Sequence, residues 1–288
     1  MQKREVDIVV ISDIHLGTYG CHAQELCHYL QSIQPKTFII NGDFIDGWNF
    51  SKKYFPDAHF AVIQLVIQYI TSGVDVIYIT GNHDEFLRKY SGLSLSNFKI
   101  LDKVVLHVDQ KKHWIFHGDI FDRSTRGFSK YLAIWGGKGY DWLIRFNRVL
   151  NFVLEKTGHE KYSLSKKVKD SVKKAVRFIA DFEQMAADQA IHQGYDVVIC
   201  GHIHNPQMKT FVNAQGSVQY LNSGDWVENL SALEYHEGCW KLYQYPKHDK
   251  PLAEKLKFLN QWPQEYVTGS QHQVVNDFLK FYFKHHSI

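Results

Sequence analysis

Short runs of apolar, mostly β-branched residues occur five times along the chain, and each run ends abruptly in a polar motif. The runs cover residues 6–11, 37–40, 74–80, 114–116 and 197–200. Continuous apolar runs of this length are typical of strands that are buried on both faces of a sheet. We therefore predict five buried strands, each followed by a polar loop.

Helical periodicity separates the early strands. Apolar residues recur at helical spacing at Ala23, Leu26, Leu30 and Ile33, and again at Phe60, Ile63, Val66, Ile67 and Ile70. Gly73 is placed to end the second helix. Alternating strands and helices indicate α/β units with much parallel pairing. Because ligands of open α/β sheets bind beyond the carboxyl ends of the strands, the five polar motifs should lie along one edge.

The segment from about residue 124 to 193 has a different pattern. Its apolar residues predict one helix between Trp142 and Val153 and another between Leu164 and Met185, and Gly194 is placed to close the second. We interpret this segment as a helical insertion between the fourth and fifth motifs. The expected organisation is then a domain over 1–246 that contains the insertion, and a helical C-terminal extension over 247–288.

Composition supports a globular chain. Hydrophobic residues make up 44% of the 288, which is enough for a sizeable core. No apolar run approaches the roughly 20 residues of a membrane-spanning helix, and the first residues lack the apolar region of a signal peptide, so we expect a cytoplasmic protein. The four cysteines form no CxxC pair, which argues against a zinc knuckle or a disulfide framework.

Charge is spread unevenly. The net charge is +3, but residues 123–177 hold 14 Lys and Arg against 4 Asp and Glu, so this segment carries +10 and the remainder −7. A basic segment on an acidic body suggests a surface for an anionic partner, while a solvated helical face is the simpler explanation. The negative remainder argues against a broad nucleic-acid surface, and we expect no nucleic-acid partner.

Side chains that can bind metal ions follow all five predicted strands: Asp13, His15, Asp43, Asn82, His117, His202 and His204. Their oxygen and nitrogen donors favour Mn²⁺, Fe or Zn²⁺, with Mn²⁺ as our expectation. Seven side chains exceed what one four-coordinate ion needs. The economical interpretation is two divalent ions bridged by Asp43, which can activate water and clamp the oxygens of a phosphate. Each motif alone could be an ordinary turn, so the prediction rests on their order and placement together.

The order of these motifs resembles the calcineurin-like metallophosphoesterase superfamily: Asp13-x-His15, Gly42-Asp43, Gly81-Asn82-His83-Asp84, His117-Gly118-Asp119 and Gly201-His202-x-His204. The resemblance implies a β-sandwich flanked by helices, here with a helical lid insertion, and we adopt that α/β fold over an open sheet. It also implies that Asp13, His15, Asp43 and His204 hold one ion. Asp43, Asn82, His117 and His202 would hold the other.

The resemblance implies catalytic roles as well. His83 matches the superfamily histidine that stabilises the transition state or protonates the leaving group, and Asp46 would be the carboxylate that orients it. A turn or capping residue remains the alternative interpretation of Asp46.

Within the superfamily, the chain is most similar to the UDP-2,3-diacylglucosamine diphosphatase-like group of lipid A synthesis. The similarity rests on the stretch 42–48, on 117–119, on the insertion with its stretch 162–176, and on 222–228. It implies cleavage of a UDP-linked acylated sugar to UMP and a sugar 1-phosphate. The well-studied members carry Arg where this chain has His83, which leaves the exact substrate open.

The insertion offers groups that suit a lipid-linked nucleotide. Arg126, Lys169, Lys173 and Lys174 could meet a diphosphate or the anionic inner face of a membrane, with the protein held there peripherally. An alternative function is a phosphodiesterase or phosphatase that acts on soluble nucleotides or phosphoproteins. A non-catalytic metal-binding scaffold is a remote alternative, because every ligand position and His83 are filled.

Overall fold

The computed structural model of the protein describes residues 3–49, 54–124 and 164–246. In this part of the chain the strands form two sheets. The first has the strand order β12-β11-β1-β2-β3-β5-β4. Its strands are β1 (Arg4–Ile11), β2 (Ile33–Asn41), β3 (Asp75–Ile79), β4 (Ser94–Leu95), β5 (Phe98–Leu101), β11 (Ser231–His236) and β12 (Cys239–Gln244). β1, β2, β3 and β5 are parallel, and the outer strands pair antiparallel.

The second sheet has the order β6-β7-β8-β10-β9. Its strands are β6 (Lys103–Val108), β7 (Lys111–Phe116), β8 (Val197–Cys200), β9 (Gln207–Asn213) and β10 (Gly216–Asn222). The three central strands β7, β8 and β10 are parallel, whereas β6 and β9 close the edges as antiparallel strands. Parallel strands therefore form the middle of both sheets, where they are covered on both faces.

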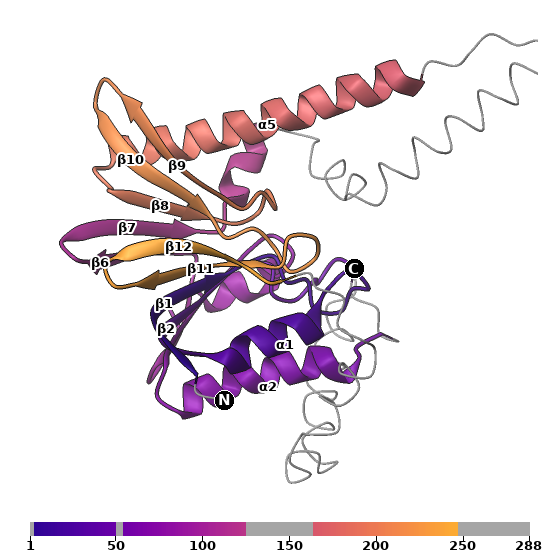
Figure 1. Cartoon of the computed structure of the whole chain (residues 1–288), viewed down its shortest axis with the longest axis vertical. Coiled ribbons are helices and arrows are strands. Elements are labelled where there is room, and N and C mark those ends of the chain that lie inside the picture. The colour runs from indigo at the N-terminus through magenta and orange to yellow at the C-terminus, as the bar shows by residue number, and fades with distance from the viewer. Residues whose placement is uncertain (1–2, 50–53, 125–163, 247–288) are drawn as a thin grey trace, which may run out of the picture. The chain divides into compact units, whose positions relative to one another are not determined.

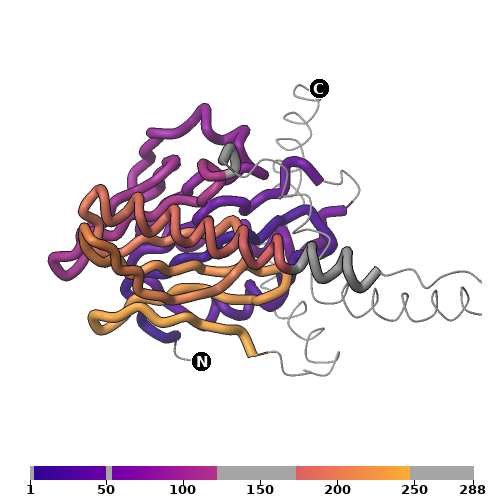
Figure 2. Tube along the Cα trace, turned by 90° about the horizontal axis from the view of Figure 1, so that it is seen from above, coloured from indigo at the N-terminus to yellow at the C-terminus, as the bar shows by residue number. Residues whose placement is uncertain are grey.

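Helices cover the outer faces of the two sheets (Figure 1). α1 (Ala23–Ser32) and α2 (Asp57–Thr71) lie against the first sheet, and α5 (Leu164–His192) contacts β8, β9 and β10 of the second. Figure 2 shows α5 running across the second sheet. Two short 3₁₀ helices, η1 (Glu85–Tyr90) and η2 (Asp119–Ser124), follow the third and fourth motifs.

The two sheets pack face to face. One apolar cluster joins Ile8, Val10, Ile39 and Ile77 of the first sheet to Ile115, Val197, Ile199 and Leu221 of the second. A second cluster lies between the second sheet and α5, and includes Trp114, Phe116, Phe178, Phe182, Ala186, Ala190, Val198 and Tyr220. The layer order helix, sheet, sheet, helix confirms the predicted β-sandwich flanked by helices.

All five predicted strands are present, with small differences at their ends. Ile33 was expected in the first helix, but it begins β2 and pairs with Arg4. The Ile33 side chain is buried, and a strand buries an apolar residue as well as a helix does. Helical spacing alone therefore assigned Ile33 to the wrong element. Pro35 is tolerated inside β2 because β3 pairs only from Thr37 onward, so no partner on that side needs its missing N–H.

The insertion is described only in part. α5 accounts for its C-terminal section, and Gly194 follows the helix with a φ of +70° as expected for a C-terminal cap. The helix predicted between Trp142 and Val153 lies outside the described residues, as does the extension over 247–288, so both stay predictions. The described residues from 3 to 245 belong to one compact unit. No helix among the described residues is long and apolar enough to cross a membrane.

Candidate metal centre

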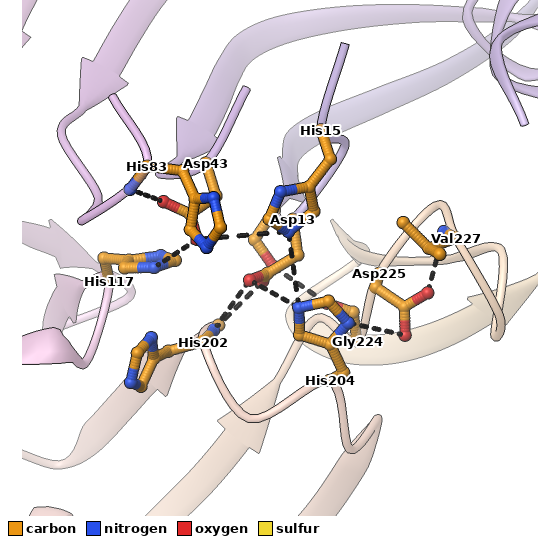
Figure 3. A network of polar contacts seen from close by, with 12 residues as sticks. Asp13, His15, Asp43, His83, His117, His202, His204, Gly224, Asp225 and Val227 are labelled. Atoms are coloured by element: carbon orange, nitrogen blue, oxygen red, sulfur yellow. Dashed lines mark hydrogen bonds and ion pairs between the residues drawn. The ribbon is translucent and has the colours of Figure 1, made fainter. Parts of the chain in front are cut away.

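The five polar motifs meet where the two sheets join (Figure 3). Their backbones are linked directly: the Asp13 N–H donates to the Gly42 carbonyl at 3.1 Å, and the His15 N–H donates to the Asp43 carbonyl at 2.9 Å. In the second sheet, the Gly201 N–H donates to the His117 carbonyl at 2.9 Å. The motif loops therefore hold each other in place before any side chain is considered.

Backbone conformation is unusual at this site. Five of the predicted ligands have positive φ angles: Asp13 at 53°, His15 at 54°, Asp43 at 53°, His202 at 67° and His204 at 50°. Residues other than glycine rarely adopt this left-handed region, and such strained positions gather at functional sites. These backbone conformations direct the five side chains toward the same region.

Two glycines let the loops approach each other closely. A Cβ on Gly81 would lie 2.2 Å from Oδ1 of Asp43, and a Cβ on Gly42 would lie 2.3 Å from Nδ1 of His117. Gly42 also has a φ of +83°, which only glycine adopts easily. Each glycine thus packs against a predicted ligand from a different motif, and any side chain there would displace it.

One group of potential metal ligands consists of Asp13, His15 and His204, whose ligand atoms lie within 4.8 Å of one another. Nε2 of His204 is 3.2 Å from Oδ1 of Asp13 and 3.4 Å from Nε2 of His15. The Asp13 carboxylate also accepts the backbone N–H of His202, at 3.0 and 3.2 Å to its two oxygens. This group joins a loop of the first sheet to a loop of the second.

A second group consists of Asp43, His117 and His202. Nε2 of His117 is 3.2 Å from Oδ2 of Asp43 and 3.3 Å from Oδ1 of Asn82, so the amide oxygen belongs to the same place. Asp43 Oδ2 is also 4.0 Å from Nε2 of His15. The Asp43 carboxylate therefore lies between the two groups, where a shared ligand would have to be.

The donor atoms fit divalent cations. His117 donates from Nδ1 to the carbonyl of Asn41 at 2.8 Å, which leaves Nε2 to face Asp43 and Asn82 with its lone pair. Nitrogens of His15 and His204 face each other at 3.4 Å, an arrangement that a shared cation satisfies better than two neutral rings. The bond from Nδ1 of His117 to the Asn41 carbonyl is of the kind that usually orients a histidine that binds a metal ion.

Charges at the site depend strongly on one another. Burial opposes ionisation of Asp13, but the neighbouring His204 outweighs it and lowers the pKa of Asp13 to about 2. Burial likewise opposes the charge of His204, yet Asp13 raises the pKa of His204 to about 9. The Asp43 carboxylate raises the pKa of His117 well above its ordinary value, against the effect of burial. The raised pKa values of His117 and His204 favour their protonated forms in the absence of cations, so cation binding at these two side chains must release protons.

His83 lies beside these groups. Its backbone N–H donates to Oδ1 of Asp43 at 2.8 Å, and its Nδ1 is 2.9 Å from Oδ1 of Asp46. The Asp46 carboxylate raises the pKa of His83 above its ordinary value although burial acts against it. Asp46 also contacts Nδ1 of His15 at 3.2 Å through its other oxygen. The predicted partner of His83 thus touches a predicted metal ligand as well.

Two residues that support the site were not identified from the sequence. Asp225 accepts the backbone N–H of Val227 at 2.8 Å and lies 3.8 Å from Nδ1 of His204, which places it behind that histidine. Asp84 is fully buried and accepts from the N–H groups of Gly81 and Phe44. Both carboxylates lie in stretches on which the family resemblance rests. The sequence signal that could have identified them is their position shortly after a strand.

The predicted substrate-binding residues are only partly described by the structure. Lys173 and Lys174 are exposed on α5, whereas Arg126 and the side chain of Lys169 lie outside the described residues. Their role stays a prediction.

Comparison with known proteins agrees with the geometry. The UDP-2,3-diacylglucosamine hydrolase of Aliivibrio fischeri (strain MJ11) is 23% identical over 242 residues, covering 82% of this chain and 98% of that protein. The protein of the same name from Aeromonas salmonicida (strain A449) is 26% identical over 245 residues, covering 81% and 91%. Among solved structures, a novel archaeal phosphodiesterase is 16% identical and covers 82% of this chain and 98% of that one. The TM-score of the two structures is 0.39.

A family model described as calcineurin-like phosphoesterase matches residues 6–206, a span that includes all five motifs. The match covers most of the chain. This protein therefore belongs to the calcineurin-like phosphoesterase family, as a metal-dependent hydrolase.

Proposed function

We propose that this protein hydrolyses the pyrophosphate bond of UDP-2,3-diacylglucosamine, or of a related lipid-linked nucleotide sugar, to UMP and a sugar 1-phosphate. The observation that carries the proposal is the placement of Asp43 between two groups of ligand atoms. The names of the relatives, which match this chain over almost their whole length, support the substrate.

We assign Asp13, His15, Asp43 and His204 to one divalent ion and Asp43, Asn82, His117 and His202 to the other. Mn²⁺ is our expectation, and Fe or Zn²⁺ would suit the same donors. When bound, the ions supply charge that stabilises the phosphoryl oxygens and lowers the pKa of water. The chain itself fixes where that charge lies, because five of the seven ligands are buried and backbone contacts link their loops.

We assign the transfer of a proton to His83. Asp46 faces Nδ1 of this ring, so Nε2 is the nitrogen that protonates the leaving oxygen as its bond to phosphorus breaks. A protonated His83 suits this role, and its raised pKa favours that form. General acid catalysis of this kind contributes roughly 10²- to 10⁴-fold.

We further propose a cytoplasmic location at the inner face of the membrane, where an acylated substrate resides. The exposed lysines Lys173 and Lys174 on α5 support this, because juxtaposed basic side chains favour an anionic surface.

A substrate panel in Mn²⁺ tests the proposal. Phosphorus NMR should show UMP and sugar 1-phosphate from UDP-2,3-diacylglucosamine, and water labelled with oxygen-18 should show which phosphorus is attacked. The Asp43→Asn variant should lose the activity, and the Asp7→Asn variant, altered in a remote carboxylate, should keep it. Equal or faster turnover of a soluble diester or nucleotide would replace the lipid substrate with the soluble one. Absence of turnover with every phosphate ester would leave a metal-binding scaffold.

A further inference from the structure

Three consecutive residues, Asp46, Gly47 and Trp48, contact His83 in three different ways. Asp46 faces its Nδ1 at 2.9 Å, and the Gly47 N–H donates to its carbonyl at 2.8 Å. The indole ring of Trp48 packs against the imidazole, with ring centroids 4.2 Å apart and planes inclined by 33°. The loop after β2 therefore encloses His83 from its backbone to its ring.

The loop is built for this close approach. A Cβ on Gly47 would lie 2.7 Å from the carbonyl oxygen of His83, so only glycine lets the loop sit there. The Trp48 N–H donates to Oδ1 of Asp46 at 3.1 Å, and the Asn49 N–H donates to the same oxygen at 2.7 Å. These bonds fix the Asp46 carboxylate and the start of the Trp48 side chain as one unit.

The charge of Asp46 does not set the plane of the His83 ring, and His15 meets that ring edge to face, with centroids 4.6 Å apart. The short contact between Asp46 and Nδ1 of His83 is an ion pair whose angle is not that of a hydrogen bond. Rotation of a histidine ring about χ2 is broad, so a single charge at one nitrogen does not fix its plane. The indole face of Trp48 restricts that rotation by direct packing.

Core packing does not account for Trp48. Its side chain is 56% exposed, although a buried tryptophan would stabilise the fold far more than an exposed one. Its ring packs against His83, while more than half of the residue is exposed. Replacing it should therefore leave the fold intact, which separates its effect on His83 from general damage.

We propose that Trp48 is a positioning residue that holds the imidazole of His83 in the orientation needed for proton transfer to the leaving oxygen. This inference rests on the proposed function, because it uses the role assigned to His83. During the hydrolysis the oxygen of a water molecule bonds to phosphorus and gives up a proton to solvent. The bond between phosphorus and the leaving oxygen breaks, and the leaving oxygen takes the proton from Nε2 of His83. Positioning of this kind matters because small displacements of a catalytic group lower the rate strongly.

Aryl esters of UMP test the proposal with Mn²⁺-loaded protein. Phenol leaves poorly without a proton, whereas p-nitrophenol leaves as the anion. For the phenyl ester, we expect kcat of Trp48→Ala to fall by about 10-fold or more, with KM unchanged, and we expect little change for the p-nitrophenyl ester. Trp48→Phe keeps an aromatic face and should retain most of the rate. Tyr19→Ala removes another exposed aromatic side chain and should behave as the wild type.

A spectroscopic measurement checks the packing without any substrate. In protein with labelled histidine, the ring protons of His83, identified by their loss in His83→Gln, should shift downfield in Trp48→Ala as the ring current of the indole disappears. An unchanged His83 signal would overturn the proposal, and so would equal losses for both esters. A raised KM at constant kcat would instead make Trp48 a substrate contact and also overturn it.

Failure of the proposed function has its own signature. If His83→Ala shows no greater loss for the phenyl ester than for the p-nitrophenyl ester, His83 is not the proton donor, whatever Trp48 does. If that variant shows the expected dependence but Trp48→Ala does not, the function stands and the positioning role is wrong.

Discussion

At the scale of single residues, Asp46 is shared between two histidines with different proposed tasks. One carboxylate oxygen faces Nδ1 of His15 and the other faces Nδ1 of His83. Burial opposes its charge, but the hydrogen bond with His15 and the ion pair with His83 lower the pKa of Asp46 below its ordinary range. A charged Asp46 therefore orients one proposed metal ligand and the proposed proton donor together.

We predict that Asp46→Asn weakens both tasks. Loss of the charge should lower metal affinity or kcat by about 10- to 100-fold, as is usual when the support of a metal ligand is removed. Titration with Mn²⁺ and steady-state kinetics measure the two effects. Asp7→Asn is the matched control, because Asp7 of β1 also contacts Nδ1 of a histidine, His236 of β11, at 3.1 Å. Equal effects of the two substitutions would contradict the role of Asp46.

His59 provides a pH dependence that is separate from the proposed ligands. Its Nδ1 accepts the N–H of Gly17 at 2.9 Å, and burial lowers the pKa of His59 to about 4. Between about pH 4 and the ordinary histidine value near 6.5, the unfolded chain thus binds more protons than the folded one. The contribution of neutral His59 to the free energy of unfolding is therefore complete above about pH 6.5 and is lost as the pH falls toward 4.

We therefore predict that the free energy of unfolding decreases from pH 6.5 to 4 more steeply in the wild type than in His59→Gln. The glutamine oxygen can accept the same N–H but cannot titrate. One proton accounts for at most about 1.4 kcal/mol for each pH unit. Urea unfolding of both proteins across this range measures the slopes, and parallel curves would show that His59 is not responsible.

The supporting roles of residues in other loops, such as Asp225 and Trp48, could not be predicted in the way that the ligands were. The predicted ligands follow strands directly, and parallel strands bring such positions together. Asp225 and Trp48 reach His204 and His83 only because of the path that each loop takes. Periodicity contains no information about that path.

At the scale of elements, the loops after the strands combine positive φ angles with close contacts between motifs. The third motif, which contains Gly81, packs closely against the second, because Gly81 lies beside the Asp43 carboxylate. Asp43 is itself held by the N–H of His83 from that third motif. The position of Asp43 therefore depends on how closely the loops after β2 and β3 approach.

We predict that Gly81→Ala moves Asp43 and lowers metal affinity or kcat by about 10-fold or more. The new Cβ would meet Oδ1 of Asp43 at 2.2 Å, so a shift is unavoidable. Gly73→Ala is the control. Its φ of +89° makes it costly to stability, but its Cβ would meet nothing within 4 Å. Metal titration of the folded protein should show weaker binding in Gly81→Ala and unchanged binding in Gly73→Ala. Unchanged metal affinity in Gly81→Ala would show that the approach of Gly81 does not position Asp43.

Strands after the fifth motif were not predicted from the apolar runs. β11 and β12 form a hairpin whose turn has positive φ at Glu237 and Gly238, the type I′ geometry. A sequence of Glu-Gly between two short strands is a weaker signal than Asn-Gly or Asp-Gly. The central parallel strands could be predicted because both of their faces are buried, while partly exposed edge strands such as β9 lack continuous apolar runs.

At the scale of the whole molecule, both groups that consist of predicted metal ligands take residues from both sheets. Asp13 and His15 come from the first sheet and meet His204 from the second, while Asp43 meets His117 and His202. The apolar runs alone predicted an open sheet with one edge, and the sandwich came from the family resemblance. Nothing in the pattern of a buried run tells which of two stacked sheets it joins.

Because cations would join the two sheets, we predict that Mn²⁺ raises the midpoint of thermal unfolding. A ligand at 100 times its Kd stabilises the folded state by about 2.7 kcal/mol. Scanning calorimetry with and without a chelator measures the shift, which should become much smaller in Asp43→Asn and stay normal in Asp7→Asn. No shift in the wild type would mean that the sheets hold no cation between them.

Anomalous diffraction from crystals soaked in Mn²⁺ tests the central claim most directly. We expect two peaks about 3.5–4 Å apart, on either side of the Asp43 carboxylate. His15 and His204 should contact one ion, and His117 and His202 the other. A single peak, or two peaks that do not share Asp43, would contradict the two-cation site on which the proposed reaction depends.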